Sequence, residues 1–167
     1  MMRTLWTAVL LAACSSALAT DSVKATVGHM CCGGCKSAAI AGAKSIPWAD
    51  DAVVDGTVMT VTAKEGARVE LISLVEAMNK AGFPAREILA EGPVTLTIAH
   101  LCCPACANDL KTAVSNLRGQ VIDKDNAKVD AAAKTLTIGP VAGRKMNVVA
   151  LLSQLGRAGF SATSCTL

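Results

Sequence analysis

The segment His29-Met30-Cys31-Cys32-Gly33-Gly34-Cys35 has a second copy, His100-Leu101-Cys102-Cys103-Pro104-Ala105-Cys106. The two copies hold six of the eight cysteines in the chain, and each contains a Cys-x-x-Cys pair with one more cysteine directly before it. Each copy follows a short alternating apolar run and precedes a stretch with apolar residues at helical spacing. Thiolates at this spacing bind one soft metal ion or form a disulfide. We therefore expect the chain to be organised around two cysteine loops.

The sequence around the loops repeats as well. Residues 23–27 align with 94–98 at the offset of 71 positions that relates the two loops, whereas 81–83 align with 158–160 at an offset of 77. The second copy therefore carries six extra residues. The polar, alanine-rich stretch 123–134 is predicted to hold them, between the first helix and the third strand of that copy.

Each copy has the order strand, loop, helix, hairpin, helix, strand. Gly56 marks the hairpin, and Gly82 and Gly159 stand where helices commonly end. The apolar positions of the predicted helices are Ala39, Ala43, Ile46, Leu71, Ile72, Val75 and Met78, with counterparts Leu110, Val114, Leu117, Val148, Val149, Leu152 and Leu155. This β-α-β-β-α-β order is that of the ferredoxin-like fold.

The predicted class is therefore α+β, with two tandem ferredoxin-like domains. Each is expected to have a four-stranded antiparallel sheet with two helices on one face. The first domain is predicted in residues 20–89, a linker in 90–93 and the second domain in 94–167.

The first 19 residues have the pattern of a signal peptide, with Arg3 before the apolar run 5–13 and the cleavage sequence Ala17-Leu18-Ala19. Export to the periplasm or the extracellular space is therefore expected. An alternative is that Leu11-Ala12-Ala13-Cys14 is a lipobox, which would anchor the protein through a lipid on Cys14. No stretch of the mature chain is expected to span a membrane.

Composition argues against several functions. The net charge is only +3, aromatic residues make up 2% of the chain, and no basic run is present, so nucleic-acid binding is not expected. We find no catalytic triad, paired carboxylates, phosphate loop or cofactor motif, so the protein is not expected to be an enzyme.

With the cysteine loops placed between strand and helix on a β-α-β-β-α-β frame, both copies resemble the heavy-metal-associated domain family. That family includes copper chaperones, periplasmic mercury-binding proteins and the N-terminal modules of metal-transporting P-type ATPases. The resemblance implies that Cys32, Cys35, Cys103 and Cys106 are the metal-binding pairs. It implies metal ions as ligands, about one per domain, and a membrane metal transporter or another metal-binding domain as a partner.

The resemblance also places two kinds of residue near the loops. Met30 and Leu101 correspond to the family methionine that packs beneath the loop. Phe83 and Phe160 fall at the position beside the metal, although helix-end phenylalanines are more often part of the core.

Both loops depart from the family pattern. His29 and His100 replace a glycine, and Cys31 and Cys102 stand directly before the pairs. Two thiolates favour Cu(I) or Hg(II). Three thiolates, with or without a histidine, approach the tetrahedral set that Zn(II) or Cd(II) prefers.

Gly33-Gly34 allows close wrapping of the first loop, whereas Pro104-Ala105 stiffens the second. We therefore expect Cys31 to contribute more to its site than Cys102 does.

Two other functions fit the same motif: a thiol–disulfide oxidoreductase, and a structural module whose cysteines are oxidised. An oxidoreductase would need a thioredoxin-like frame, and the extra adjacent cysteine is unusual there. Two copies of the pair on a repeated frame favour metal binding over structural disulfides. Cys165, in the last strand, is predicted to lie away from the loop of its own domain, either free or paired between chains.

Overall fold

The computed structural model describes residues 22–119 and 121–167. The predicted targeting segment 1–19, including Cys14, lies outside the described residues. Among the helices that the structure describes, none has both the length and the hydropathy needed to cross a membrane. In chain order the elements are β1 (Ser22–Val27), α1 (Gly33–Lys44), β2 (Ala49–Asp55), β3 (Val58–Ala63), α2 (Leu71–Lys80), β4 (Ala85–Ala90), β5 (Val94–Ile98), α3 (Pro104–Ser115), β6 (Lys128–Asp130), β7 (Thr135–Ile138), β8 (Met146–Asn147), α4 (Val148–Arg157) and β9 (Ala162–Thr166).

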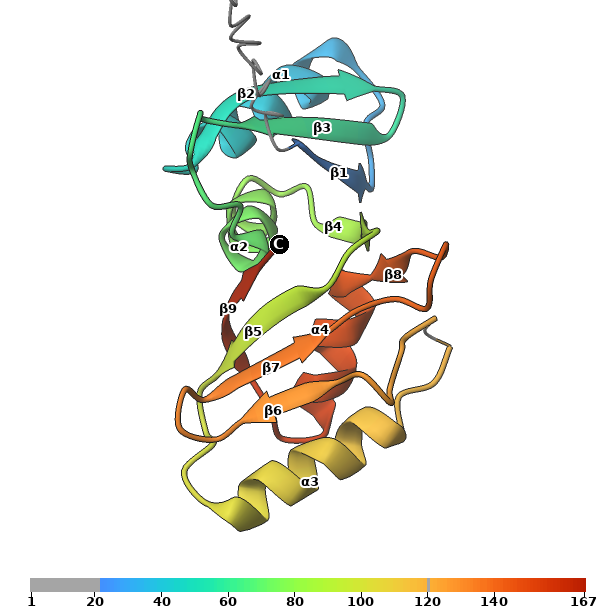
Figure 1. Cartoon of the computed structure of the whole chain (residues 1–167). Coiled ribbons are helices and arrows are strands. Elements are labelled where there is room, and N and C mark those ends of the chain that lie inside the picture. Colours follow the sequence, from blue (N-terminus) through green and yellow to red (C-terminus); the bar gives the residue numbers. More distant parts are fainter. Residues whose placement is uncertain (1–21, 120) are drawn as a thin grey trace, which may run out of the picture.

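The strands form two antiparallel sheets, one in each half of the chain (Figure 1). In the first sheet the order is β2-β3-β1-β4, and in the second the equivalent strands follow the same order, β6-β7-β5-β9. This is the strand order of the ferredoxin-like fold, which agrees with the sequence. The prediction of four strands per sheet is wrong in one respect, because β8 from the second half adds a fifth strand to the first sheet, next to β4.

The alternating apolar residues of β1 and β5 form the centre of each sheet. Val23, Ala25 and Val27 are buried, while the residues between them are exposed or only partly buried. Ala25 pairs with Met59 of β3 on one side and Ile88 of β4 on the other, and both partners are buried. Period-two alternation of this kind places one face of a strand against the helices.

The helices bury a narrower face than the sequence analysis predicted. In α2 the buried residues are Leu71, Leu74 and Met78, and in α4 they are the equivalent Val148, Leu151 and Leu155. Ile72 and Val75 were expected in the core but are only partly buried. A spacing of three and then four residues keeps side chains on one face of a helix, and Leu74 continues that face whereas Ile72 leaves it.

The six extra residues of the second half are divided between two places. Val54 pairs with Met59, whereas the equivalent pair is Val129 with Leu136, so the β6–β7 connection is two residues longer. The other four residues lie between α3 and β6. Beside this longer connection the strand itself is shorter: β6 has three residues, whereas the equivalent β2 has seven.

The two halves exchange backbone contacts at their junction. Asn147, directly before α4, pairs with Leu89 of β4, and Glu70, directly before α2, pairs with Thr166 in β9. Glu70 and Asn147 occupy equivalent positions, as do Leu89 and Thr166, so the two contacts are related by approximate two-fold symmetry. The buried residues of both halves belong to one continuous cluster. The halves are therefore packed against each other, not joined by the linker alone.

Glu70 supports this junction with its carboxylate. The backbone N–H groups of Ile72 and Ser73, in the first turn of α2, donate to its two oxygens, so Glu70 acts as the N-cap of that helix. The backbone N–H of Cys165 in β9 donates to the same carboxylate at 2.8 Å. Asn147 caps α4 through Val149 and Ala150 only.

We expect Glu70→Ala to destabilise the protein more than Asn147→Ala. Loss of an N-cap costs about 1 kcal/mol. Glu70→Ala also leaves the Cys165 N–H without its acceptor in a partly buried place, which costs about 1–3 kcal/mol more. Urea unfolding of the two variants and the unmodified protein measures the difference. Equal losses would show that the Glu70–Cys165 contact contributes nothing to stability.

Candidate metal-binding loops

Each cysteine loop connects the central strand of a sheet to a helix (Figure 1). Cys32 is the N-cap of α1, and its Sγ accepts a hydrogen bond from the Cys35 backbone N–H at 3.4 Å. Cys103 caps α3 in the same way, with Cys106 N–H as donor at 3.4 Å. A helix N-terminus carries unpaired N–H groups and the positive end of the helix dipole, which favours a thiolate there.

In the first loop three sulfur atoms converge. The Sγ atoms of Cys32 and Cys35 lie 3.2 Å apart, those of Cys31 and Cys35 lie 3.6 Å apart, and all three lie within 4.8 Å of one another. Nε2 of His29 is 3.9 Å from Cys31 Sγ. His29 has a φ of 67°, in the left-handed region. This irregular backbone allows the neighbouring Cys31 and Cys32 to reach the same place.

The second loop gathers the same residue types in a different set. Here a ring nitrogen of His100 and the Sγ atoms of Cys102 and Cys106 lie within 4.8 Å of one another. His100 Nε2 is 3.8 Å from Cys102 Sγ, and Cys102 Sγ is 3.9 Å from Cys106 Sγ. Cys103 Sγ is 3.1 Å from Cys106 Sγ. Three of the predicted ligands are therefore mutually close in each loop, and His29 and Cys103 each lie near one member of the group in their own loop.

The loops also separate the pKa values of the paired thiols. The Cys35 backbone N–H lowers the pKa of Cys32 by stabilising its thiolate. The contact with Cys32 raises the pKa of Cys35, to about 11, and Cys31 adds to this effect. In the second loop the Cys106 backbone N–H lowers the pKa of Cys103, and the contact with Cys103 raises that of Cys106. One thiol of each pair is therefore the better nucleophile.

The residues beneath the loops anchor them to the core. Leu101 is buried, and its counterpart Met30 is partly buried against the core. Phe83 and Phe160 are also partly buried against the core, which agrees with their interpretation as core residues. Within the described part of the chain, a Cβ added at Gly33 would meet nothing within 4 Å apart from its chain neighbours and its own helix backbone, so the space beside this residue is open.

Sequence reasoning missed one residue beside the first loop, Arg86. A Cβ added at Gly28, which precedes His29, would lie 2.7 Å from Arg86 Nε, so the arginine side chain packs across that glycine. The equivalent residues of the second half are Ala99 and Thr163. The second half has alanine at the position of Gly28 and no arginine at the position of Arg86. This paired difference between the two copies is the sequence signal that points to the contact.

Cys165 is separate from both loops. Its side chain is fully buried, and burial raises the pKa of its thiol to about 12, with a further contribution from Glu70. Cys165 is a free thiol in this structure, and because it is buried, pairing between chains would require the residues around it to move.

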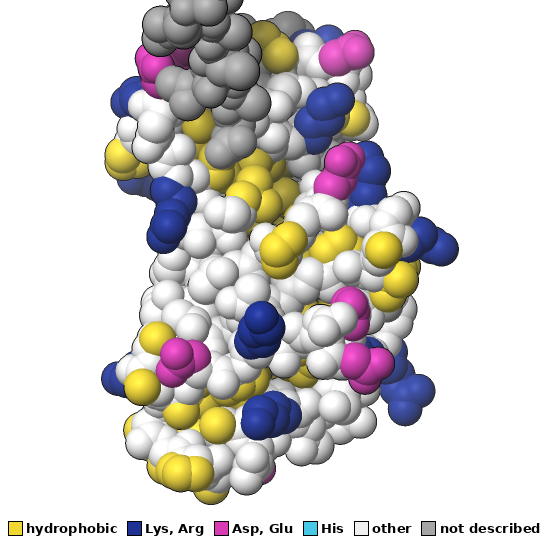
Figure 2. Space-filling model, viewed as in Figure 1, with side chains coloured by type: hydrophobic (Ala, Val, Ile, Leu, Met, Phe, Trp, Pro, Cys, Tyr) yellow, Lys and Arg dark blue, Asp and Glu magenta, His cyan; other side chains and the backbone are white. Residues whose placement is uncertain are grey.

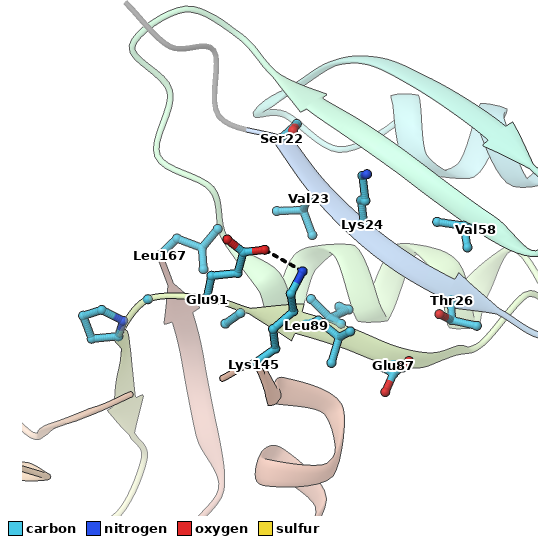
Figure 3. A pocket seen from close by; sticks show the side chains of 14 residues that line it. Ser22, Val23, Lys24, Thr26, Val58, Glu87, Leu89, Glu91, Lys145 and Leu167 are labelled. Carbon is cyan, nitrogen blue, oxygen red and sulfur yellow. Dashed lines mark ion pairs between the residues drawn. The ribbon is translucent and has the colours of Figure 1, made fainter. Parts of the chain in front are cut away.

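A groove of about 810 Å³ runs along the junction, over β1 and β4 (Figure 3). Leu89 and Leu167 line it with exposed apolar side chains, and the ion pair between Lys145 and Glu91, at 2.6 Å, lies beside it. Figure 2 shows exposed hydrophobic side chains at the height of the junction between the two halves, whereas charged side chains are scattered over the same face. Among the residues that the structure describes, no cysteine or histidine lines the groove, so it is not part of either cysteine loop.

Comparison with known proteins gives no family assignment. No family model matches the chain, and no curated protein matches it. Two solved structures from Bacillus subtilis are similar at 21% sequence identity and a TM-score of 0.38. One is of the N-terminal soluble domains of CopA and covers 87% of this chain and 93% of its own. The other is of the water-soluble region of the P-type ATPase CopA, with coverages of 89% and 91%.

The pKa order predicts the order of alkylation. In the reduced protein at neutral pH, iodoacetamide should modify Cys32 before Cys35 and Cys103 before Cys106, because the thiolate is the reactive form. The Cys32 rate should rise with pH and level off at a lower pH than the rate of an ordinary cysteine does, because its pKa is lowered. Cys165 should react only after unfolding. Peptide mass mapping of a time course provides the test, and faster modification of Cys35 than of Cys32 would contradict it.

Proposed function

We propose that the protein binds soft or borderline metal ions through the thiolates of its two loops, one ion at each loop, and acts as a scavenger, buffer or chaperone for them. The single observation that carries this proposal is the convergence of three cysteines in the first loop, with three sulfur atoms within 4.8 Å of one another. Sulfur atoms that converge at a helix N-terminus can share one cation.

Exposure of the loops supports transfer of the ion to a partner. Cys31, Cys32 and Cys102 are exposed, and Cys35, Cys103 and Cys106 are only partly buried. A second thiol protein can therefore approach the ion directly, and ligand exchange between thiolates needs no unfolding. This is the arrangement expected of a site that passes its ion on, whether to a membrane transporter or to another metal-binding domain.

Export is part of the same proposal. The signal-peptide pattern of the first 19 residues, outside the described residues, supports a periplasmic or extracellular protein, and the lipobox at Cys14 is the alternative. Binding Cu(I), Zn(II), Hg(II) or Cd(II) outside the cytoplasm requires that the loop cysteines stay reduced. Bound metal protects them, because a coordinated thiolate is less available for oxidation. The protein is proposed to be a carrier and not an enzyme.

A second candidate function is thiol–disulfide exchange. The lowered pKa of Cys32 and the raised pKa of Cys35 resemble the attacking and resolving thiols of a Cys-x-x-Cys oxidoreductase. The strand order is that of the ferredoxin-like fold and not of the thioredoxin fold. Thiol–disulfide exchange by Cys32 and Cys35 also assigns no role to Cys31. We therefore rank this function below metal binding.

The direct test is the metal stoichiometry of cysteine variants. The reduced protein should bind two Cd(II) ions by native mass spectrometry. The double variants Cys32→Ser/Cys35→Ser and Cys103→Ser/Cys106→Ser should each lose one ion and keep the other, because each ion depends on its own loop. Cys165→Ala is the matched control and should keep both ions, because Cys165 is buried away from the loops.

Two results would count against the proposal. Binding of two ions by a variant that lacks both pairs would place the metal elsewhere. Failure of the reduced protein to bind any ion, together with rapid reduction of a disulfide substrate, would support the exchange function instead.

A further inference from the structure

The two loops have the same residue types but bring different donor atoms together. At the first loop the mutually close donors are three sulfur atoms, from Cys31, Cys32 and Cys35. At the second loop they are one imidazole nitrogen, from His100, and the sulfur atoms of Cys102 and Cys106. Pro104 begins α3 directly after Cys103, whereas α1 begins with glycine after Cys32. The stiffer second loop and the left-handed His29 in the first give the two backbones different paths.

The two loops also differ in the charged residues that surround them. Arg86 packs across Gly28 at the base of the first loop, and Lys36 directly follows Cys35. The equivalent residues at the second loop are Thr163 and Ala107, both uncharged. Three thiolates around one ion leave a net negative charge, and nearby cations stabilise such a site. When a neutral imidazole takes the place of one thiolate, the site is less negative, so nearby cations stabilise the second loop less.

We infer that the two loops take different classes of metal ion: a soft ion held by sulfur alone at the first loop, and a borderline divalent ion such as Zn(II) held with the help of His100 at the second. This inference rests on the proposed function, because it assigns ligands within the loops proposed to bind metal. Soft ions prefer all-sulfur donors, whereas imidazole suits divalent ions such as Zn(II) and Co(II). The protein then carries two different cargoes at once.

The loops lie too far apart to share an ion. The β1–α1 connection lies beside the first sheet, and the β5–α3 connection lies at the far end of the second (Figure 1). Each ion must therefore reach and leave its own loop. This separation allows the two preferences to be independent.

The test uses Co(II), a spectroscopic substitute for Zn(II), and the matched variants His29→Ala and His100→Ala. Each histidine is studied in a chain whose other loop is inactivated by the double serine substitution, so that one site is observed at a time. His100→Ala should weaken Co(II) binding at the second loop at least about 10-fold, the size of loss that even a residue behind a metal ligand produces. His29→Ala should change binding at the first loop less than about 2-fold.

A second pair of variants tests the charge difference. Arg86→Thr, which copies the second half, should weaken Cu(I) binding at the first loop about 2- to 5-fold at low salt and less at high salt, as for an exposed ion pair. Thr163→Ala is the matched control at the second loop and should leave Cu(I) binding there unchanged. Arg86 and Thr163 are both exposed, and urea unfolding checks that each variant keeps its fold.

The outcomes separate the inference from the proposed function. If both histidine variants lose Co(II) affinity equally, or neither does, the two loops are equivalent and the inference is wrong while metal binding stands. If neither loop binds Co(II) or Cu(I) in any background, the proposed function itself fails. A loss confined to His100→Ala, with a salt-dependent loss for Arg86→Thr, establishes two chemically different sites.

Discussion

The hydrogen bond from the Cys35 backbone N–H to Cys32 Sγ, and its equivalent from Cys106 to Cys103, connects the fold to the chemistry. A helix must satisfy the N–H groups of its first turn, and a side-chain acceptor at the N-cap is a common solution. Here that acceptor is sulfur. Because the capping atom is also the proposed metal ligand, forming the helix places one thiol of the pair and favours its thiolate form. The second thiol lies in the first turn, and the helical backbone holds it beside the first.

The rest of the structure holds these two helix starts in place. The central strands β1 and β5 deliver the chain to the loops, and buried Leu101 and partly buried Met30 fix the loop backbone from below. The exchanged contacts at the junction, Glu70 with Thr166 and Asn147 with Leu89, join the two halves along their last strands. The first loop lies beside the first sheet and the second at the far end of the second sheet (Figure 1), and the cysteines of both are exposed or only partly buried.

Much of this arrangement follows from the sequence. The repeat, the alternation of β1 and β5 and the glycines after α2 and α4 were sufficient to predict the element order and both cysteine loops. These signals are local, and each depends on a periodicity or a conformational requirement within a few residues. The gathering of these cysteines and histidines in two loops followed from their position between a strand end and a helix start. The choice of Leu74 over Ile72 for the core also had a sequence signal, a spacing of three and four residues from Leu71 to Met78.

Contacts between the halves had no such signal. The addition of β8 to the first sheet, the Glu70 carboxylate on Cys165 N–H and the burial of Cys165 depend on how two copies pack, which no periodicity reveals. Arg86 was missed because it lies on the last strand of its half, far in sequence from the loop that it touches. The difference between the two donor sets depends on backbone paths, which glycine and proline at equivalent positions suggest but do not determine.

The central claim is that each loop binds its own ion through sulfur. Correlation spectroscopy between ¹¹³Cd and the cysteine Hβ protons tests it most directly, because scalar coupling passes only through a metal–sulfur bond. With two equivalents of Cd(II), the account predicts two cadmium resonances, one coupled to Cys31, Cys32 and Cys35 and the other to Cys102 and Cys106. A single resonance, or coupling to cysteines of both loops from one ion, would contradict it.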